Sequence, residues 1–160
     1  VYDNKHGKLV KADENLLAGD PMLYRKGAKY SGPEHMLYST AWDLAQFYSM
    51  MLNKGQWNGK RLLSPSSVEV MSVVHTGDIK AGHEIGTGFG LTWEVVKENL
   101  GTLTGQSIGA FGHGGAFGTY GWIDPKKELV GVFLVGSDGP TKPVRDTFIG
   151  IANAAITEAK

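Results

Sequence analysis

The chain has 160 residues, enough for one domain with a real core, and its 41% hydrophobic and 20% charged residues are ordinary for a globular protein. Its 16 basic residues balance its 16 acidic ones without forming a basic block, which argues against nucleic acid or an anionic membrane as partner. The lack of cysteine excludes disulfides, thiolate metal sites and a cysteine nucleophile, and leaves the compartment open. No apolar run approaches the roughly 18 residues of a membrane span.

Residues 1–36 are predicted to form a lead-in of loop and hairpin. Residues 2–10 predict the hairpin, because Asn and Gly stand between two short extended arms. The chain starts at Val1 rather than at a methionine, so we expect it to derive from a longer or processed gene product.

Residues 37–74 form a helical part. A helix is predicted over residues 41–54, with Thr40 and Asp43 as a capping pair at its start and Gly55 as a left-handed stop. Its apolar stripe recurs at helical spacing and consists of Leu44, Phe47, Tyr48, Met51 and Leu52.

A second helix is predicted to begin at Pro65, because Ser64 is a favoured N-cap and proline is favoured at the first helical position. It presents three apolar side chains on one face, those of Val68, Met71 and Val74.

Residues 86–160 form a sheet followed by a helix. Apolar residues alternate from Gly86 onward and predict one strand through Phe89, Leu91, Trp93 and Val95. A turn region follows at 99–105. Three further extended segments are predicted, at 108–113, 117–124 and 129–135, with a turn at 124–127 between the last two. The segment 129–135 is apolar enough to be covered on both faces.

A closing helix is predicted from an apolar stripe that consists of Val144, Phe148, Ile151, Ala152, Ala155 and Ile156. The order of elements predicts an α+β fold in which helices flank an antiparallel sheet. We find no internal repeat or linker, so residues 1–160 are expected to form a single domain.

The most unusual segment surrounds His113. Glycine weakens a strand and usually marks a bulge or the close approach of a ligand or another backbone. The segment reads as extended and yet holds six glycines: Gly109, Gly112, Gly114, Gly115, Gly118 and Gly121. Local features alone leave two interpretations open, a ligand site around a titratable histidine or a strongly bent strand with a surface histidine.

Other motifs carry less weight. Ser107 lies in a G-x-S-x-G pattern, but no helix is predicted after it, as a nucleophile elbow requires. Tyr2 and Asn4 match a Tyr-x-Asn pattern but lead into a charged hairpin. The glycines of 86–90 precede a strand and lack the lysine of a phosphate-binding loop. Trp93 and Trp122 are expected in the core. The five histidines have no metal-binding spacing: His6, His35, His75, His83 and His113.

Taken in order, three stretches resemble the C-terminal part of the serine β-lactamase-related superfamily. This group comprises class C β-lactamases, DD-peptidases and esterases built on the same fold. The stretches are Leu37–Phe47 with its extension to Gly55, Gly88–Trp93, and Phe111–Ala116 followed by Gly121–Pro125. The resemblance implies that the chain is the C-terminal fragment of a serine hydrolase with the β-lactamase/transpeptidase-like fold.

The resemblance also implies roles for four residues. His113 occupies the lysine position of the family's Lys-Thr-Gly motif, and the Ala116 N–H donates to the oxyanion; these are the implied catalytic residues. Gly114 and Gly115 occupy the Thr and Gly positions and bind substrate. Histidine in place of lysine and glycine in place of threonine favour an esterase or peptidase-like relative over a penicillin-specific enzyme. No cofactor or metal is implied.

The family's nucleophile is absent, because no serine of this chain is followed three residues later by lysine. The isolated chain is therefore expected to be inactive. Its expected partners are a small ester, amide or β-lactam substrate and the N-terminal half of the same fold, whose missing strands would leave a sheet edge that allows self-association. The alternative is a non-catalytic binding module on the same fold.

Overall fold

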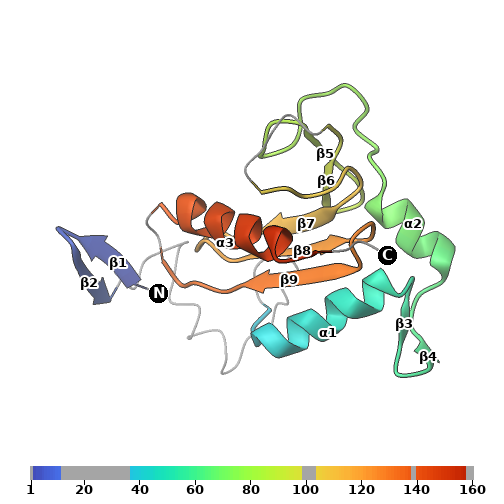
Figure 1. The fold of residues 1–160 in the computed structure, drawn as a ribbon, viewed down its shortest axis with the longest axis horizontal. Coiled ribbons are helices and arrows are strands. Elements are labelled where there is room, and N and C mark those ends of the chain that lie inside the picture. The colour runs from blue at the N-terminus through green and yellow to red at the C-terminus, as the bar shows by residue number, and fades with distance from the viewer. Residues whose placement is uncertain (1, 12–36, 99–103, 138–139, 158–160) are drawn as a thin grey trace, which may run out of the picture.

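The computed structural model describes residues 2–11, 37–98, 104–137 and 140–157. Its centre is a five-stranded antiparallel sheet, which confirms the α+β class (Figure 1). The strands lie side by side in chain order: β5 (Thr87–Phe89), β6 (Glu94–Val96), β7 (Phe111–Gly114), β8 (Tyr120–Asp124) and β9 (Leu129–Phe133).

Two helices cover opposite faces of this sheet, α1 (Ala41–Leu52) and α3 (Lys142–Ala154) (Figure 1). On one face, Gly121 of β8 leaves room for the ring of Tyr48, which a side chain at 121 would overlap. On the other face, Trp122 stands edge-on to Phe148 of α3, with ring centroids 5.9 Å apart. As predicted for β9, a helix therefore lies on each of its faces, although its side chains are only half-buried.

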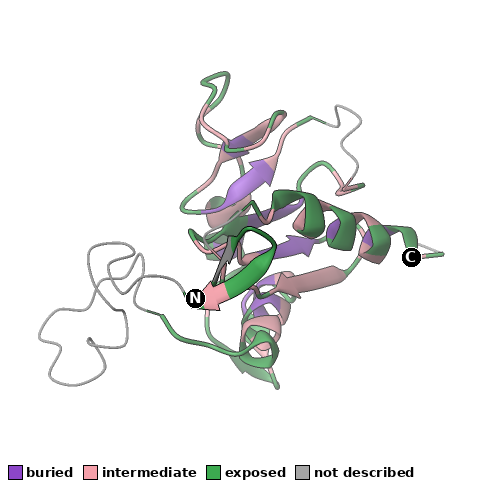
Figure 2. Cartoon of the chain, turned by 90° about the vertical axis from the view of Figure 1, so that its left-hand side faces the viewer, coloured by how far each residue is buried: buried purple, intermediate pink, exposed green. Residues whose placement is uncertain are grey.

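The core lies between α1 and the sheet, and Figure 2 shows its buried segments surrounded by exposed ones. Trp93 and Trp122 are buried, as expected, and both indole N–H groups are without a partner among the described residues. The side chains that build this core are Tyr48, Met50, Met51, Val68, Trp93, Val95, Phe111 and Ile123.

The predicted start of α1 is confirmed, because the hydroxyl of Thr40 accepts a hydrogen bond from the Asp43 N–H at 3.1 Å. The helix ends at Leu52, two residues earlier than predicted. The first left-handed residue is Lys54, with φ of 53°, and the Gly55 N–H then donates to the Met50 carbonyl at 2.9 Å. The left-handed Lys54 and the bond from Gly55 to Met50 are those of a Schellman motif, in which Gly55 occupies the second position after the cap rather than the first.

Helix α2 (Pro65–Ser72) begins as predicted, since the Ser64 hydroxyl accepts from the Ser67 N–H at 3.0 Å. Val74 lies beyond its end but still packs against the core. Between α1 and α2 lies a hairpin that we did not predict, β3 (Gln56–Trp57) and β4 (Lys60–Arg61).

The single strand predicted through Phe89 to Val95 is wrong, because the structure has two strands there, β5 and β6. The chain reverses between them: the Gly90 N–H donates to the Trp93 carbonyl at 2.8 Å, and Thr92 has a positive φ of 73°. The prediction for 108–113 was also too long, since Ile108 lies in a turn and β7 begins at Phe111.

The closing helix exists, but its predicted apolar stripe is not the buried face. Ile149 and Asn153 are buried, whereas the side chains of Val144 and Ile151 are 63% and 66% exposed. Lys127 donates to the amide oxygen of Asn153 at 2.6 Å, a polar contact that the apolar periodicity could not reveal. Ala155 and Ile156 lie beyond the end of α3.

The hairpin predicted at the start of the chain is confirmed as β1 (Tyr2–Lys5) and β2 (Lys8–Lys11). The Tyr2 N–H donates to the Gly136 carbonyl at 2.8 Å, which ties β1 to the chain that follows β9. Most of the predicted turn at 99–105 lies outside the described residues, and the turn after Asp124 is present. No helix in the described ranges is long and apolar enough to cross a membrane.

Candidate active site

The structure places His113 near the end of β7, at a position where the strand has a partner on one side only. His113 and Gly114 pair with Gly121 and Tyr120 of β8. On the other side, the register with β6 ends at Gly112, so the edge of β7 beyond that point faces no strand in the described part of the chain. This short stretch, which we call the open edge of β7, offers backbone groups to a ligand.

The imidazole of His113 is exposed, and its Nδ1 lies 2.6 Å from the Gly114 carbonyl oxygen. A carbonyl oxygen can only accept, so Nδ1 must carry the hydrogen. The neutral ring then has its lone pair on Nε2, which is an acceptor. This bond therefore fixes the tautomer that could take a proton from a neighbouring hydroxyl.

Two rings lie against His113, and sequence reasoning did not single out either of them. The centroid of His83 is 5.8 Å away at 79°, and that of Phe89 is 6.1 Å away at 47°. His83 in turn lies 3.6 Å from a carboxylate oxygen of the buried Glu94. Because His83 and His113 are thirty positions apart in the chain, no local spacing indicates their contact.

The glycines around His113 differ in how tightly their surroundings are packed. A side chain at Gly112 would overlap the Gly121 carbonyl oxygen and the Trp122 backbone, so the close approach of β8 requires glycine there. At Gly114 the nearest atom to an added Cβ would be 3.7 Å away, which is ordinary contact distance. The packing of the described chain therefore does not require glycine at position 114.

Ala116 follows β7 in the turn toward β8. The Gly115 N–H donates to the Thr119 carbonyl at 2.8 Å, on the β8 side. The chain turns at Ala116 itself, directly after this bond. Ala116 is exposed, and no oxygen among the described residues accepts from its N–H.

The other motifs are not brought to this site as working groups. The Ser107 N–H donates to Asp124 at 2.9 Å, and its segment leads into β7 rather than into a helix, so it is not a nucleophile elbow. Tyr2 and Asn4 lie in the separate hairpin of β1. Among the described residues, no group of three His, Cys, Asp or Glu side chains could hold a metal ion.

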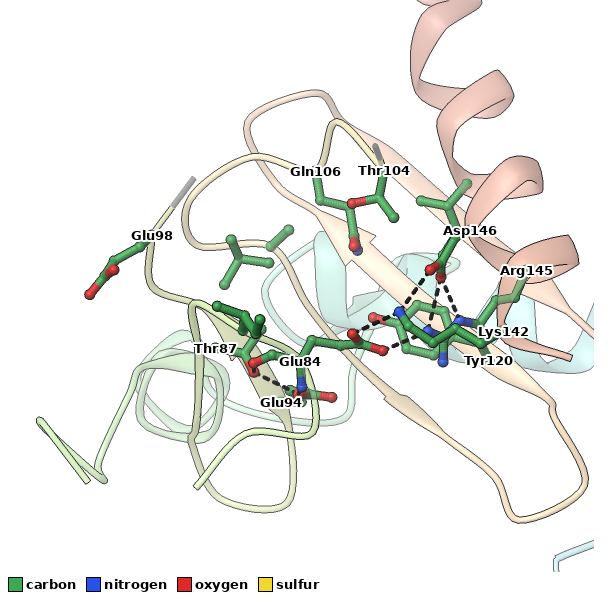
Figure 3. A pocket seen from close by; sticks show the side chains of 14 residues that line it. Glu84, Thr87, Glu94, Glu98, Thr104, Gln106, Tyr120, Lys142, Arg145 and Asp146 are labelled. Atoms are coloured by element: carbon green, nitrogen blue, oxygen red, sulfur yellow. Dashed lines mark hydrogen bonds and ion pairs between the residues drawn. The ribbon is translucent and has the colours of Figure 1, made fainter. Parts of the chain in front are cut away.

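A cavity of about 240 Å³ lies elsewhere, and none of the four sequence-predicted site residues lines it. His113 pairs with Gly121, which faces Tyr48 of α1, so His113 lies on the α1 face of the sheet. The cavity is instead lined by Tyr120 and by α3 residues, and Figure 3 shows its polar wall. Burial raises the pKa of Tyr120 to about 12.

Four charged side chains close one end of this cavity (Figure 3). Lys142 lies 2.8 Å from Glu84 and 2.7 Å from Asp146, and Arg145 bridges the same two carboxylates at 2.7 and 2.9 Å. Partial burial would raise the pKa of Glu84 and of Asp146, but the hydrogen bonds and charges of the two bases outweigh it and lower both. The network joins the loop at Glu84 to α3 and is charge-balanced.

The chain matches the family named Beta-lactamase over residues 3–156, and it belongs to that family.

Within this class, the chain is 35% identical to Protein Rv1367c of Mycobacterium tuberculosis over 109 residues, which are 62% of this chain and 27% of that protein. The chain thus spans about a quarter of the length of the curated relatives that it matches.

Three solved structures are similar. EstCE1, a hydrolase with promiscuous acyltransferase activity, has a TM-score of 0.66 at 18% identity, over 93% of this chain and 42% of that one. A penicillin-binding protein homologue from Caulobacter crescentus has a TM-score of 0.58 at 20% identity, over 72% and 32%. A proposed 6-aminohexanoate-dimer hydrolase from Bacillus anthracis has a TM-score of 0.55 at 27% identity, over 72% and 28%. The first two share the fold alone.

Proposed function

We propose that β7 forms one wall of a serine hydrolase active site whose nucleophile lies outside this chain. His113 and Ala116 are the working groups. Gly114 and Gly115 border the substrate: Gly114 lies on the open edge of β7, and Gly115, whose N–H donates to Thr119 and whose carbonyl accepts from the Gly118 N–H, adds no side chain beside it. The observation that carries this proposal is the Ala116 N–H, which has no acceptor among the described residues and follows directly on the open edge of β7.

The reaction is acyl transfer from an ester or amide to a serine, followed by hydrolysis of the acyl-enzyme. The attack places a negative charge on the former carbonyl oxygen, and in this proposal the Ala116 N–H donates a hydrogen bond to it. Loss of one such donor typically costs on the order of 10²–10³ in kcat. Similarity to the 6-aminohexanoate-dimer hydrolase supports a hydrolytic reaction.

His113 acts as an acceptor in this scheme. Its Nδ1–H is occupied by the Gly114 carbonyl, so its neutral ring offers Nε2 to the proton of a hydroxyl. A lysine at this position would be a permanent cation, and a threonine at position 114 would add a hydroxyl for a substrate carboxylate. Both differences favour esters or amides without a carboxylate over penicillins.

The test uses the full-length gene product with p-nitrophenyl esters and nitrocefin. We expect ester hydrolysis to exceed nitrocefin hydrolysis, and His113→Ala to lower kcat/KM by roughly 10²-fold, the lower range for a lost proton-transfer group. Ser107→Ala is the matched control and should retain activity. The isolated 160-residue chain should show no turnover. Ester hydrolysis by the isolated chain that Ser107→Ala abolishes would contradict the proposal.

A second candidate, a non-catalytic binding module, is favoured by one observation, the lack of any Ser-x-x-Lys in these 160 residues. The two candidates differ in the sequence that precedes Val1. A full-length protein that has no Ser-x-x-Lys, and binds an ester analogue without turnover, would support the binding module.

A further inference from the structure

We propose that His83 is a positioning residue for His113, with Glu94 as its anchor, so that the Glu94–His83 pair fixes the plane of the His113 imidazole at the open edge of β7. This inference rests on the proposed function of β7.

His113 needs such support because of where it lies. It is exposed, and the neighbouring strand β6 begins only at Glu94, opposite Gly112. No strand of the described chain therefore flanks the ring on that side, and a surface side chain without neighbours samples several rotamers. The bond from Nδ1 to the Gly114 carbonyl holds one edge of the imidazole. A second contact is needed to hold its plane.

The rings of His83 and Phe89 supply that contact. His83 stands edge-on to both of its neighbours, at 79° and 5.8 Å to His113 and at 81° and 5.5 Å to Phe89. These separations lie within the range in which aromatic rings attract one another. The three rings contact each other pairwise, so a rotation of His113 would disturb both of the others.

The buried carboxylate of Glu94 lies beside His83 in turn. The Glu94 side chain is only 5% exposed, and its Oε1 accepts from the Thr87 hydroxyl at 2.6 Å and from the Glu84 N–H at 2.9 Å (Figure 3). Its Oε2 faces Nδ1 of His83 at 3.6 Å. A buried carboxylate held by two donors cannot move easily. It therefore gives an otherwise exposed histidine a fixed point, through β6, beside the strand that carries His113.

A purely structural role for His83 would concern the loop around it. That loop has bonds that do not involve His83, because the Thr87 N–H donates to the Glu84 carbonyl at 3.3 Å and the Lys97 N–H donates to the Gly86 carbonyl at 2.8 Å. Replacement of His83 should therefore leave the loop folded while it releases the ring of His113. This separation makes the two roles distinguishable by experiment.

The experiment uses the full-length protein with 15N-labelled histidine. Long-range 1H–15N spectra report the tautomer and mobility of each imidazole, and the resonances that disappear in His113→Gln identify His113. We expect His83→Ala to shift and broaden the His113 resonances and to lower kcat for a p-nitrophenyl ester roughly tenfold with little change in KM. This is less than the roughly 10²-fold cost of a 1 Å misplacement.

Three further variants sharpen the result. His83→Phe keeps the ring contact and should retain more activity than His83→Ala, whereas Glu94→Gln should reproduce part of the spectral change. His6→Asn, in the distant β1–β2 turn, is the control and should change neither readout. Unchanged His113 resonances and kcat in His83→Ala would overturn the inference. If His113→Ala leaves hydrolysis intact, the proposed function fails instead, while the spectra still decide whether His83 orders His113.

Discussion

At the scale of single residues, Gly112 and Gly114 of β7 differ, because packing requires glycine at the first position and not at the second. Gly112 lies directly against the backbone of β8, and a Cβ there would meet a carbonyl oxygen that cannot move without disrupting the strand pair. Gly114, two positions further along, has ordinary space around it. Packing thus explains the glycine at position 112 of this strand but not the glycine at position 114.

This difference predicts opposite results for two alanine substitutions. Gly112→Ala should lower the free energy of unfolding by about 1–3 kcal/mol or more, as overpacking does. Gly114→Ala should leave it within about 0.5 kcal/mol or raise it slightly, because alanine restricts the unfolded chain. Urea unfolding followed by the fluorescence of the buried Trp93 and Trp122 measures both. A Gly114→Ala loss as large as that of Gly112→Ala would contradict the structural argument.

The sequence predicted part of the site at this scale. His113 could be predicted from the sequence, because the residue lies within a glycine-rich segment that also resembles a family motif. His83 and Glu94 could not be predicted as part of the site. The contact of His83 with Glu94 and with His113 forms only when the loop before β5 folds back to the end of β7. The roles of His113, Gly114, Gly115 and Ala116 remain predictions.

At the scale of elements, local chemistry determined which ends were predictable. Thr40 and Ser64 cap their helices as expected, because each bond spans only three residues. The β3–β4 hairpin also had a local signal that we missed, the Asn58-Gly59 pair, which adopts positive φ values of 46° and 74°. The reversal between β5 and β6 had a weaker signal, since it is held partly by the distant Met71 carbonyl, which accepts from the Leu91 N–H at 3.0 Å.

The network that joins α3 to Glu84 predicts how stability depends on pH. The folded-state pKa values of Glu84 and Asp146 lie below their ordinary values of 4.5 and 3.8. The stability from these carboxylates is therefore fully present above about pH 4.5 and is lost as pH falls through the lowered values. Glu84→Gln should lower stability at neutral pH and flatten the decline in acid.

Unfolding free energies between pH 7 and pH 3 test this. The control is Glu69→Gln on α2, where the carboxylate forms no ion pair with a described residue and the side chain is exposed. Equal acid slopes for wild type and Glu84→Gln would show that the network contributes nothing to folding.

At the scale of the whole molecule, the outer face of α3 bears on the behaviour of the isolated chain. Val144 and Ile151 lie seven residues apart on one side of the helix, and both are exposed. β9 lies at one edge of the described sheet. An apolar stripe beside a strand edge favours association with another surface, which is either the rest of the same protein or a second copy of this chain.

We therefore expect the isolated 160-residue chain to self-associate. Sedimentation equilibrium should show species heavier than the 17.2 kDa monomer, and Val144→Lys combined with Ile151→Lys should shift the population toward monomer. In a longer protein whose remaining part covers α3, the same pair should instead lower stability. A wild-type chain that sediments as a monomer at every concentration tested would contradict this expectation.

The open edge of β7 has a consequence for selectivity. Within the strand only Gly114 turns its backbone groups to it, because successive residues of a strand bond to opposite sides and the Gly115 N–H donates to the β8 side. One extended residue spans roughly 3.4 Å. Backbone pairing of that length can align one acyl unit of a bound molecule and little more. In a protein that uses this edge as proposed, the chain would thus bind the acyl unit that many compounds share. Other parts of the protein would set the preference among those compounds, so related proteins could prefer different substrates while the sequence of this strand stayed the same.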